Sequence, residues 1–234
     1  MNNEIMKCES TDKDFPIALN VLKKKPSCIY YIGDIGVLNR EKNVAIVGSR
    51  DCSDYARQLA FEAGRMAAKK NLIVVNGLAV GCDTEALLGA LDCNGRCVVI
   101  LPGGLNQIYP KQNENLAERI VNTGGCLISE YPPDVKPQKY TFVERDRIQS
   151  GVSQGVLVIE TRSDGGTMHT ANAAVRQAKR LAVYASELLK NATGNQLLEA
   201  QHKASVIRNS QMLEEFMMNL PDIEENRQLS IFDI

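Results

Sequence analysis

The stretch that decides the fold runs from residue 43 to residue 83 and reads NVAIVGSRDCSDYARQLAFEAGRMAAKKNLIVVNGLAVGCD. Its two apolar runs, residues 44–48 and 72–76, have the length and composition of buried β-strands. Between them, Ser53 or Asp54 can cap a helix. Apolar side chains recur there at helical spacing, at Leu59, Ala63, Met66 and Ala67. A strand, a crossover helix and a second strand form the repeating unit of a parallel sheet.

The same alternation continues along the chain. Further apolar runs predict strands at residues 96–101, 126–129, 155–160 and 181–184. Amphipathic stretches predict helices at residues 83–92, 113–122, 142–150 and 167–179. We therefore predict an α/β fold: a doubly wound, Rossmann-like, mostly parallel sheet with helices on both faces.

Length and composition favour one substantial globular domain. The chain has 234 residues, of which 44% are hydrophobic and 24% charged, so disordered and fibrous classes are excluded. No apolar run reaches the roughly 18 to 20 residues of a membrane helix, and the N-terminus lacks a signal peptide's apolar core. We expect a cytoplasmic protein with no membrane partner. The net charge of -1 argues against a broad basic face for duplex DNA, so a nucleic-acid site must be local.

The cysteines indicate neither a metal centre nor a disulfide framework. There are seven, they are scattered without a CxxC pair, and only two histidines could assist them as ligands. We interpret them as buried or half-buried thiols in a reducing compartment and expect no metal and no cofactor. They are Cys8, Cys28, Cys52, Cys82, Cys93, Cys97 and Cys126.

Four glycine-containing loops follow the predicted strands. They read GSR (48–50), NGLAVGCD (76–83), LPGGLNQIYP (101–110) and SDGGTMHT (163–170). In such sheets ligands bind beyond the carboxyl ends of the strands, and glycine lets backbone amides approach a phosphate closely. Tight turns also need glycine for backbone reasons alone, but four such loops together favour a cradle for an anion or a nucleotide backbone.

At this point the residues resemble the DprA/Smf family. The similar segments, in order, are GSR, NGLAVGCD, GGLNQIYPKQN (103–113), SEYPPD (129–134) and FVERDRIQSGVSQGVLVIE (142–160). The similarity extends to residues 15–39 and 194–216, so about 200 residues are covered. We divide the chain into a lead-in (1–42), a Rossmann-like DprA/Smf domain (43–216), and an acidic linker with a C-terminal peptide (217–234).

The resemblance implies a homodimer that binds single-stranded DNA in a basic pocket and loads a RecA-type recombinase during DNA uptake or recombination. No catalysis is required for this role. The family often carries an N-terminal helical domain and a C-terminal winged helix, and we expect neither here.

Three segments supply the candidate DNA-binding residues. The first holds Arg50, whose planar guanidinium suits a phosphate or a base but could also be a solvated surface charge. In the second, residues 139–147, cations alternate with Phe142, which could stack on bases or anchor its helix in the core. The third opens a helix with backbone amides and a hydroxyl. The full set is Gly48, Ser49, Arg50, Lys139, Phe142, Arg145, Arg147, Gly165, Gly166 and Thr167.

Two carboxylates stand close to these cations. Asp146 occupies a position where the family usually has asparagine, and Glu144 lies nearby. They could oppose a polyanion, or they could form ion pairs with Arg145 or Arg147 within the helix. We keep both interpretations.

An enzyme or a nucleotide-ligand sensor is the alternative function. The related LOG phosphoribohydrolases use a PGGxGTxxE motif, but Thr170 stands here where the glutamate would be. Glu130, Glu160 and Asp83 lie near strand ends and could serve as acid or base instead. A dehydrogenase is set aside, because the first turn lacks GxGxxG.

The chain ends in QLSIFDI, residues 228–234, which resembles the short peptide that binds the bacterial sliding clamp. In that resemblance Gln228 enters a polar notch, while Leu229, Ile231 and Phe232 fill an apolar groove. The ending could equally be an apolar strand or plug that folds back on the domain.

Overall fold

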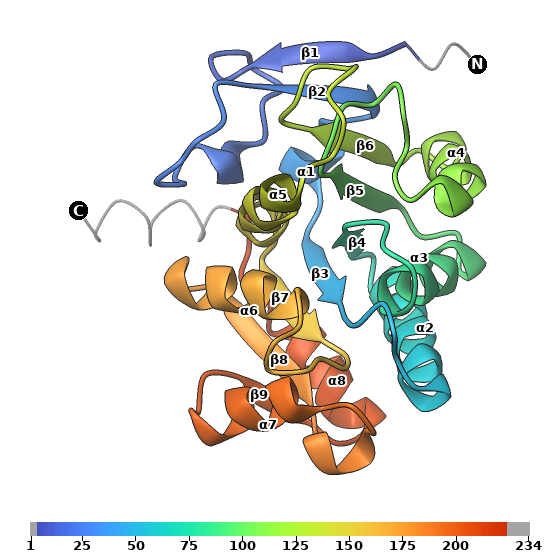
Figure 1. Ribbon diagram of the computed structural model, residues 1–234, viewed down its shortest axis with the longest axis vertical. Coiled ribbons are helices and arrows are strands. Elements are labelled where there is room, and N and C mark those ends of the chain that lie inside the picture. The colour runs from blue at the N-terminus through green and yellow to red at the C-terminus, as the bar shows by residue number, and fades with distance from the viewer. Residues whose placement is uncertain (1–3, 224–234) are drawn as a thin grey trace.

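The computed structural model describes residues 4–223, and within them nine strands form one sheet (Figure 1). Their order is β1-β2-β6-β5-β4-β3-β7-β8-β9. The strands are β1 (Met6–Glu9), β2 (Cys28–Gly33), β3 (Asn43–Val47), β4 (Ile73–Asn76), β5 (Cys97–Leu101), β6 (Cys126–Ser129), β7 (Gly155–Val158), β8 (Arg180–Tyr184) and β9 (Ser205–Ile207). Strands β3 to β9 pair in parallel, whereas β1 and β2 form an antiparallel edge against β6.

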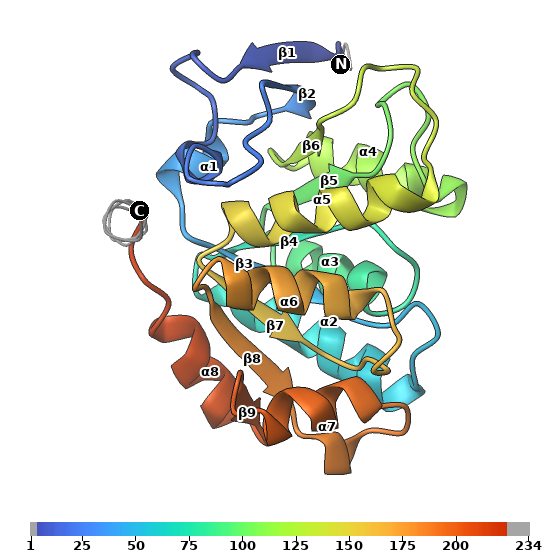
Figure 2. The same ribbon diagram turned by 60° about the vertical axis from the view of Figure 1, so that its left-hand side comes forward.

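The helices cover both faces of this sheet, as Figure 2 shows. They are α1 (Val37–Arg40), α2 (Asp54–Lys69), α3 (Cys82–Asp92), α4 (Glu114–Asn122), α5 (Lys139–Val152), α6 (Thr167–Arg176), α7 (Thr193–Ala200) and α8 (Ser210–Met218). Buried side chains of α2, α3, α4 and α8 share one apolar cluster with one set of strand residues. Those of α1, α5, α6 and α7 share a second cluster on the opposite face. The predicted doubly wound α/β architecture is therefore confirmed.

Several element boundaries differ from the predictions for local reasons. Helix α5 begins at Lys139 rather than residue 142, because Gln138 and Thr141 form a capping box before it. Helix α6 ends at Arg176 rather than residue 179, because Ala178 adopts a positive φ of 52°. Ser53, one of the two predicted caps, accepts a hydrogen bond from Ala56 N at 3.2 Å.

The lead-in segment contributes to the same sheet. Strand β2 pairs with β6 through the register Tyr30 to Ser129, and β1 pairs with the other side of β2. The division at residue 42 stays a prediction, but residues 6–33 extend the sheet as its antiparallel edge. The clamp-like peptide, residues 228–234, lies outside the described residues.

The order of strands fixes where a ligand can bind. From β3 the chain winds outward through β4, β5 and β6, then returns to the other side of β3 with β7 and continues through β8 to β9. Beyond the carboxyl ends of β3 and β7 the connecting loops therefore diverge, and this switch point is the usual ligand site of open α/β sheets. None of the helices in residues 4–223 is long and apolar enough to cross a membrane.

Candidate nucleic-acid interface

A cavity of about 400 Å³ opens at this switch point. Three of the glycine-containing loops and one helix contribute its walls. The loop after β3 provides Gly48, Ser49 and Arg50; helix α5 provides Phe142, Arg145 and Asp146; the loop before α6 provides Gly165 and Gly166, and α6 itself begins there with Thr167. Eight of the ten predicted DNA-binding residues are thus brought together around one cavity.

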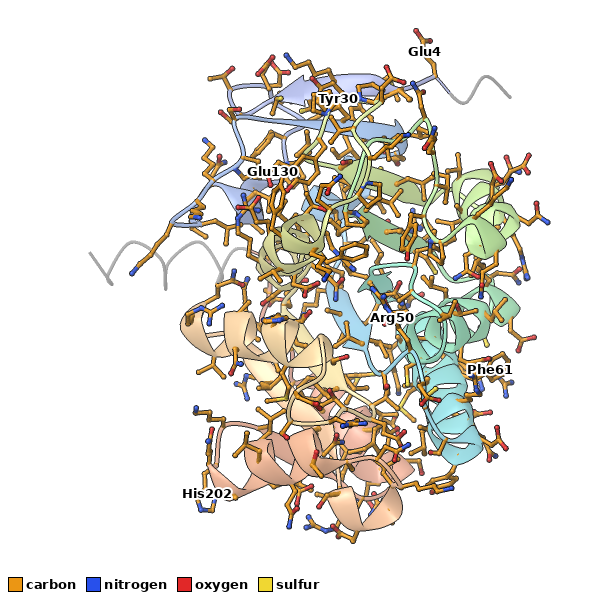
Figure 3. The ribbon with its side chains drawn as sticks, in the orientation of Figure 1. Glu4, Tyr30, Arg50, Phe61, Glu130 and His202 are labelled. Atoms are coloured by element: carbon orange, nitrogen blue, oxygen red, sulfur yellow. The ribbon has the colours of Figure 1, made fainter. Side chains whose placement is uncertain are left out.

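A smaller cavity of about 170 Å³ adjoins the first. The two share Arg50, Phe142 and Arg145 in their walls, and the smaller one adds Tyr109 and Gln112. Since Tyr109 belongs to the LPGGLNQIYP loop, all four glycine-containing loops reach one of the two cavities. Figure 3 shows Arg50 on the loop that leaves β3, near the middle of the molecule.

Arg50 and Phe142 line both cavities, and Tyr109 lines the smaller one beside them. The Arg50 guanidinium carbon lies 5.2 Å from the centroid of the Phe142 ring, a cation-π contact. The Tyr109 ring meets Phe142 edge to face, with centroids 5.5 Å apart and planes at 76°. Phe142 is half-buried, whereas Arg50 and Tyr109 are exposed. Phe142 therefore lies at the cavity surface and not in the apolar core, in contact with Arg50 and Tyr109.

Arg145 lies deeper, with only 7% of its side chain exposed. Its Nη1 donates to Gln149 Oε1 at 2.6 Å, and its Nε lies 3.4 Å from Asp146 Oδ1. Within residues 4–223 this buried Nε makes no hydrogen bond, so the ion pair with Asp146 is what stabilises it. A methyl group at Gly77 would lie 1.4 Å from Arg145 Nη1, so a larger residue at 77 would displace the guanidinium.

Two buried carboxylates lie beside these cations. Burial raises the pKa of Asp83 to about 6, against the opposing effects of Arg145 and of backbone amides, including those of Gly77 and Ala79. Burial also raises the pKa of Asp146, against the opposing effects of Arg145, His169 and Arg50. The predicted ion pair within α5 is therefore present between Arg145 and Asp146. The cavity is mixed in charge, because Asp51, Asp83 and Asp146 line it together with Arg50, Arg145 and Arg162, and burial opposes the ionisation of Asp83 and Asp146.

Lys139 and Arg147 do not line either cavity. Arg147 Nη2 donates to Glu130 Oε1 at 2.6 Å, and both side chains are about one-fifth exposed. Lys139 is exposed at the first residue of α5. Glu144 accepts a hydrogen bond from the Tyr131 hydroxyl at 2.9 Å. Residues 139–147 are thus divided between the cavity wall and a separate polar cluster.

The carboxylates considered for catalysis have different surroundings. Glu160 is fully buried and accepts from Ser53 N at 3.0 Å, Ser53 Oγ at 2.8 Å and Lys190 N at 3.3 Å, so it holds the start of α2. Glu130 is paired with Arg147. Asp83 is the one of the three that lines the cavity.

Gly103 and Gly104 are explained by packing. Gly104 N donates to Val135 O at 2.8 Å, and a methyl group at Gly104 would lie 2.2 Å from the carbonyl oxygens of Pro132 and Pro133. The PGG turn therefore packs against the loop before α5 and presents Tyr109, not its glycines, to the cavities. Sequence reasoning did not single out Tyr109, Gln112 or Gln149, although the first lies in a loop already identified.

Comparison with known proteins gives a consistent picture. The family profile described as DNA recombination-mediator protein A matches residues 7–218. DNA processing protein DprA of Bacillus subtilis is 30% identical over 197 residues, which are 84% of this chain and 66% of that protein. Protein Smf of Escherichia coli is 35% identical over 71% of this chain and 44% of its own length. The chain thus spans less than two thirds of either relative.

Solved structures show the same fold. DNA processing protein A of Streptococcus pneumoniae superposes with a TM-score of 0.82 at 27% identity, covering 94% of this chain and 75% of the other. The protein of Helicobacter pylori, whose structure concerns its single-stranded DNA binding mode, also gives 0.82 at 29% identity, covering 94% of this chain and 96% of the other. The molybdenum cofactor carrier protein of Chlamydomonas reinhardtii shares the fold alone, with a TM-score of 0.55 at 16% identity over 77% of this chain and 98% of the other.

Proposed function

Since the chain belongs to the DNA recombination-mediator protein A family, we propose that it binds single-stranded DNA in the two adjoining cavities and acts as a recombination mediator. The observation that carries this proposal is the contact of the Arg50 guanidinium with the Phe142 ring, which Tyr109 also contacts edge to face. A cation beside aromatic rings is the combination with which proteins bind unpaired nucleic acid.

In this proposal the larger cavity receives the sugar-phosphate backbone. Arg50 can form paired hydrogen bonds to a phosphate, and Arg145 adds a second positive charge to the cavity wall. Gly165 and Gly166 precede the first turn of α6, where the helix dipole favours an anion, while the amides of Gly165, Met168 and His169 donate to backbone carbonyls. The exposed Lys139 attracts the DNA strand electrostatically as it approaches the cavities. Arg147, being paired with Glu130, orders the helix instead.

The rings explain a preference for single strands. Phe142 and Tyr109 can stack only on a base whose face is free, and the bases of a duplex are already stacked on their neighbours. Stacking is largely independent of base identity, so we expect little sequence preference. The net charge of -1 removes the broad electrostatic attraction that would otherwise favour duplex DNA.

Fluorescence anisotropy with labelled single-stranded and duplex oligonucleotides tests this function. We expect single-strand preference, a loss of roughly tenfold or more in affinity for Arg50→Ala, and a shallower dependence of affinity on salt. Arg176→Ala is the matched control, because Arg176 is exposed at the end of α6 and lines neither cavity. Equal affinity for duplex and single strands would contradict the proposal.

We further propose that the protein acts as a homodimer and loads a RecA-type recombinase onto the bound strand. This step extends the family assignment and requires no catalysis. Light scattering at micromolar concentration should give twice the 25.8 kDa chain mass. Addition of the protein should shorten the lag of recombinase filament growth on strands covered by a single-strand binding protein. The Arg50→Ala variant should fail to do so.

One observation favours a second candidate function. Asp83 lines the larger cavity, and its pKa of about 6 suits a general acid or base near neutral pH. This would fit cleavage of a nucleoside monophosphate, as in the LOG alternative. Release of free base, abolished by Asp83→Asn, would support that reaction. The absence of base release at millimolar nucleotide would leave DNA binding as the function.

A further inference from the structure

A third cavity, of about 510 Å³, lies along α2 and shares no lining residue with the two cavities of the candidate interface. One face of α2 forms one wall, and the start of α8 forms another. Tyr184, the last residue of β8, and Leu188, in the turn after it, also line the cavity. Small-molecule sites in proteins measure about 300 to 1,000 Å³, so this cavity has the size for one small organic ligand.

Helix α2 contributes one continuous stripe of side chains to this cavity. Side chains at intervals of three and four residues share one face of a helix. Those that line the cavity at this spacing are Tyr55, Leu59, Glu62, Met66 and Lys69. Leu59 and Met66 pack against the apolar cluster that contains Tyr184 and Leu213, both of which also line the cavity. The inner wall is therefore apolar, and a ligand with an apolar body gains free energy by displacing water from it.

The Tyr184 hydroxyl is a polar group without a partner in this wall. The residue is only 4% exposed, and within residues 4–223 its hydroxyl makes no hydrogen bond. The oxygen is not one of the fully enclosed polar atoms that lack a partner, so it opens to the cavity that the residue lines. Burial raises the pKa of Tyr184, and the nearby Tyr55 and Glu62 raise it further, so the hydroxyl stays protonated. It thus offers a donor to an acceptor inside the cavity.

The start of α8 lies beside Tyr184. Strand β9 pairs with β8 as far as Tyr184, and only two residues separate β9 from α8. In the first turn of this nine-residue helix, Met212 N donates to the Asn209 side chain at 2.9 Å. The amides of Ser210 and Gln211 have no acceptor within residues 4–223. These two amides and the helix dipole favour an anionic group at this end of the cavity.

Most charges of the cavity wall are paired with one another or with neighbours. The charged residues of the lining are Arg65, Lys69, Lys70, Arg208, Glu62 and Glu214. Salt bridges join Arg65 to Glu62 and Asp92, at 3.3 and 3.2 Å, and Lys70 to Glu214. Arg208 pairs with Glu187 at 3.1 Å, but its side chain is 52% exposed and it stands two residues before α8. Because such surface pairs are weak, the Arg208 guanidinium can also contact an anion at the start of that helix.

We propose that this cavity binds a small organic anion with an aromatic body, at a site separate from the DNA cavities. The ring packs against Leu59, Met66 and Leu213. The anionic group lies at the first turn of α8, next to Arg208. The Tyr184 hydroxyl donates to an acceptor atom of the ligand. Aromatic carboxylates and nucleoside monophosphates share this chemistry, since both join a planar ring to an anionic group.

Fluorescence titration with anilinonaphthalene sulfonate tests this inference. The dye joins an aromatic body to one sulfonate, and phenylnaphthylamine is its counterpart without the charge. Tyr184→Phe should lower the affinity for the sulfonate about three- to tenfold, because one hydrogen bond is lost. Arg208→Ala should lower it roughly threefold and leave the affinity for the uncharged dye unchanged.

Two matched controls remove the same groups elsewhere. Tyr30→Phe changes a tyrosine of β2, near the opposite edge of the sheet (Figure 3). Arg180→Ala changes an exposed arginine at the first residue of β8. Neither residue lines the cavity, so both variants should bind the sulfonate as the parent chain does.

Competition experiments identify the class of ligand and separate this site from the DNA cavities. Displacement of the sulfonate by naphthoate would support an aromatic carboxylate, and displacement by adenosine monophosphate a nucleotide. Displacement by neither, or unchanged affinity in both Tyr184→Phe and Arg208→Ala, would overturn the inference. Displacement by single-stranded DNA would place the dye in the DNA cavities and overturn it as well. Dye binding that is lost as the chain dimerises would show that a second copy covers the cavity, which also overturns it. If no strand binds, the proposed function fails, while the two variants still locate the dye.

Discussion

Replacement of Asp83 by asparagine tests the charge balance of the cavity wall. Asp83 is 5% exposed, and burial raises its pKa from 3.8 to about 6. Because the folded pKa lies above the unfolded value, ionisation costs stability as pH rises, and protonation restores stability as pH falls. The interval between the two values corresponds to about 3 kcal/mol of unfolding free energy when the carboxyl is fully ionised, above about pH 7. At pH 4 most of this cost is absent.

The assay is urea unfolding of both proteins at pH 4, 6 and 8. Asparagine at 83 can still accept from the amides of Gly77 and Ala79, which donate to one oxygen of Asp83 at 3.0 and 3.4 Å. Between pH 4 and pH 8 the free energy of unfolding of the variant should therefore rise by more than about 2 kcal/mol relative to that of the parent chain. Asp164→Asn is the control, since its side chain is 72% exposed. A difference between Asp83→Asn and the parent that stays constant over this pH range would refute the reasoning.

Three further predictions follow from the contacts of the site. Gly77→Ala places a methyl group 1.4 Å from Arg145 Nη1, so the guanidinium must move and single-strand affinity should fall about tenfold in anisotropy titrations. Phe142→Leu keeps an apolar side chain but removes the stacking face, so affinity should fall by about 1 to 3 kcal/mol in the same titrations. Glu160→Gln weakens the charge-assisted bonds to Ser53, so thermal unfolding followed by circular dichroism should show a loss of about 1 to 3 kcal/mol.

Each of these variants has an outcome that contradicts its explanation. Unchanged affinity in Gly77→Ala would show that Arg145 makes no contact with DNA. If Phe142→Leu and the parent chain bind alike, stacking on that ring is excluded. An unchanged melting temperature in Glu160→Gln would mean that its three hydrogen bonds contribute nothing to α2.

The parallel core of the fold could be predicted because each of its strands is a continuous apolar run. Strands β3, β5 and β7 are buried at every position, and buried parallel strands carry this pattern. The edge strands could not be recognised in the same way. Strand β1 has one buried residue in four, and β9 has only three residues, so neither shows a period.

The candidate site was predictable in its loops but not fully on helix α5. Phe142, Arg145, Asp146 and Gln149 all line the larger cavity, and their spacing of three, four and seven residues places them on one helical face. Arg147 is two residues from Arg145 and therefore points elsewhere, toward Glu130. Helical spacing would have separated the two arginines. Tyr109 could not be placed from sequence, because its contact with Phe142 joins a loop to a helix 33 residues further along the chain.

Photo-crosslinking tests most directly whether the strand lies between Arg50 and the aromatic rings. A single-stranded oligonucleotide carrying 5-iodouracil is bound, irradiated and digested, and the crosslinked peptides are identified by mass spectrometry. We predict crosslinks to Phe142 and Tyr109 that disappear in Arg50→Ala at equal protein concentration. Crosslinks confined to peptides of α4 or α8, and unaffected by Arg50→Ala, would contradict the assignment of this site.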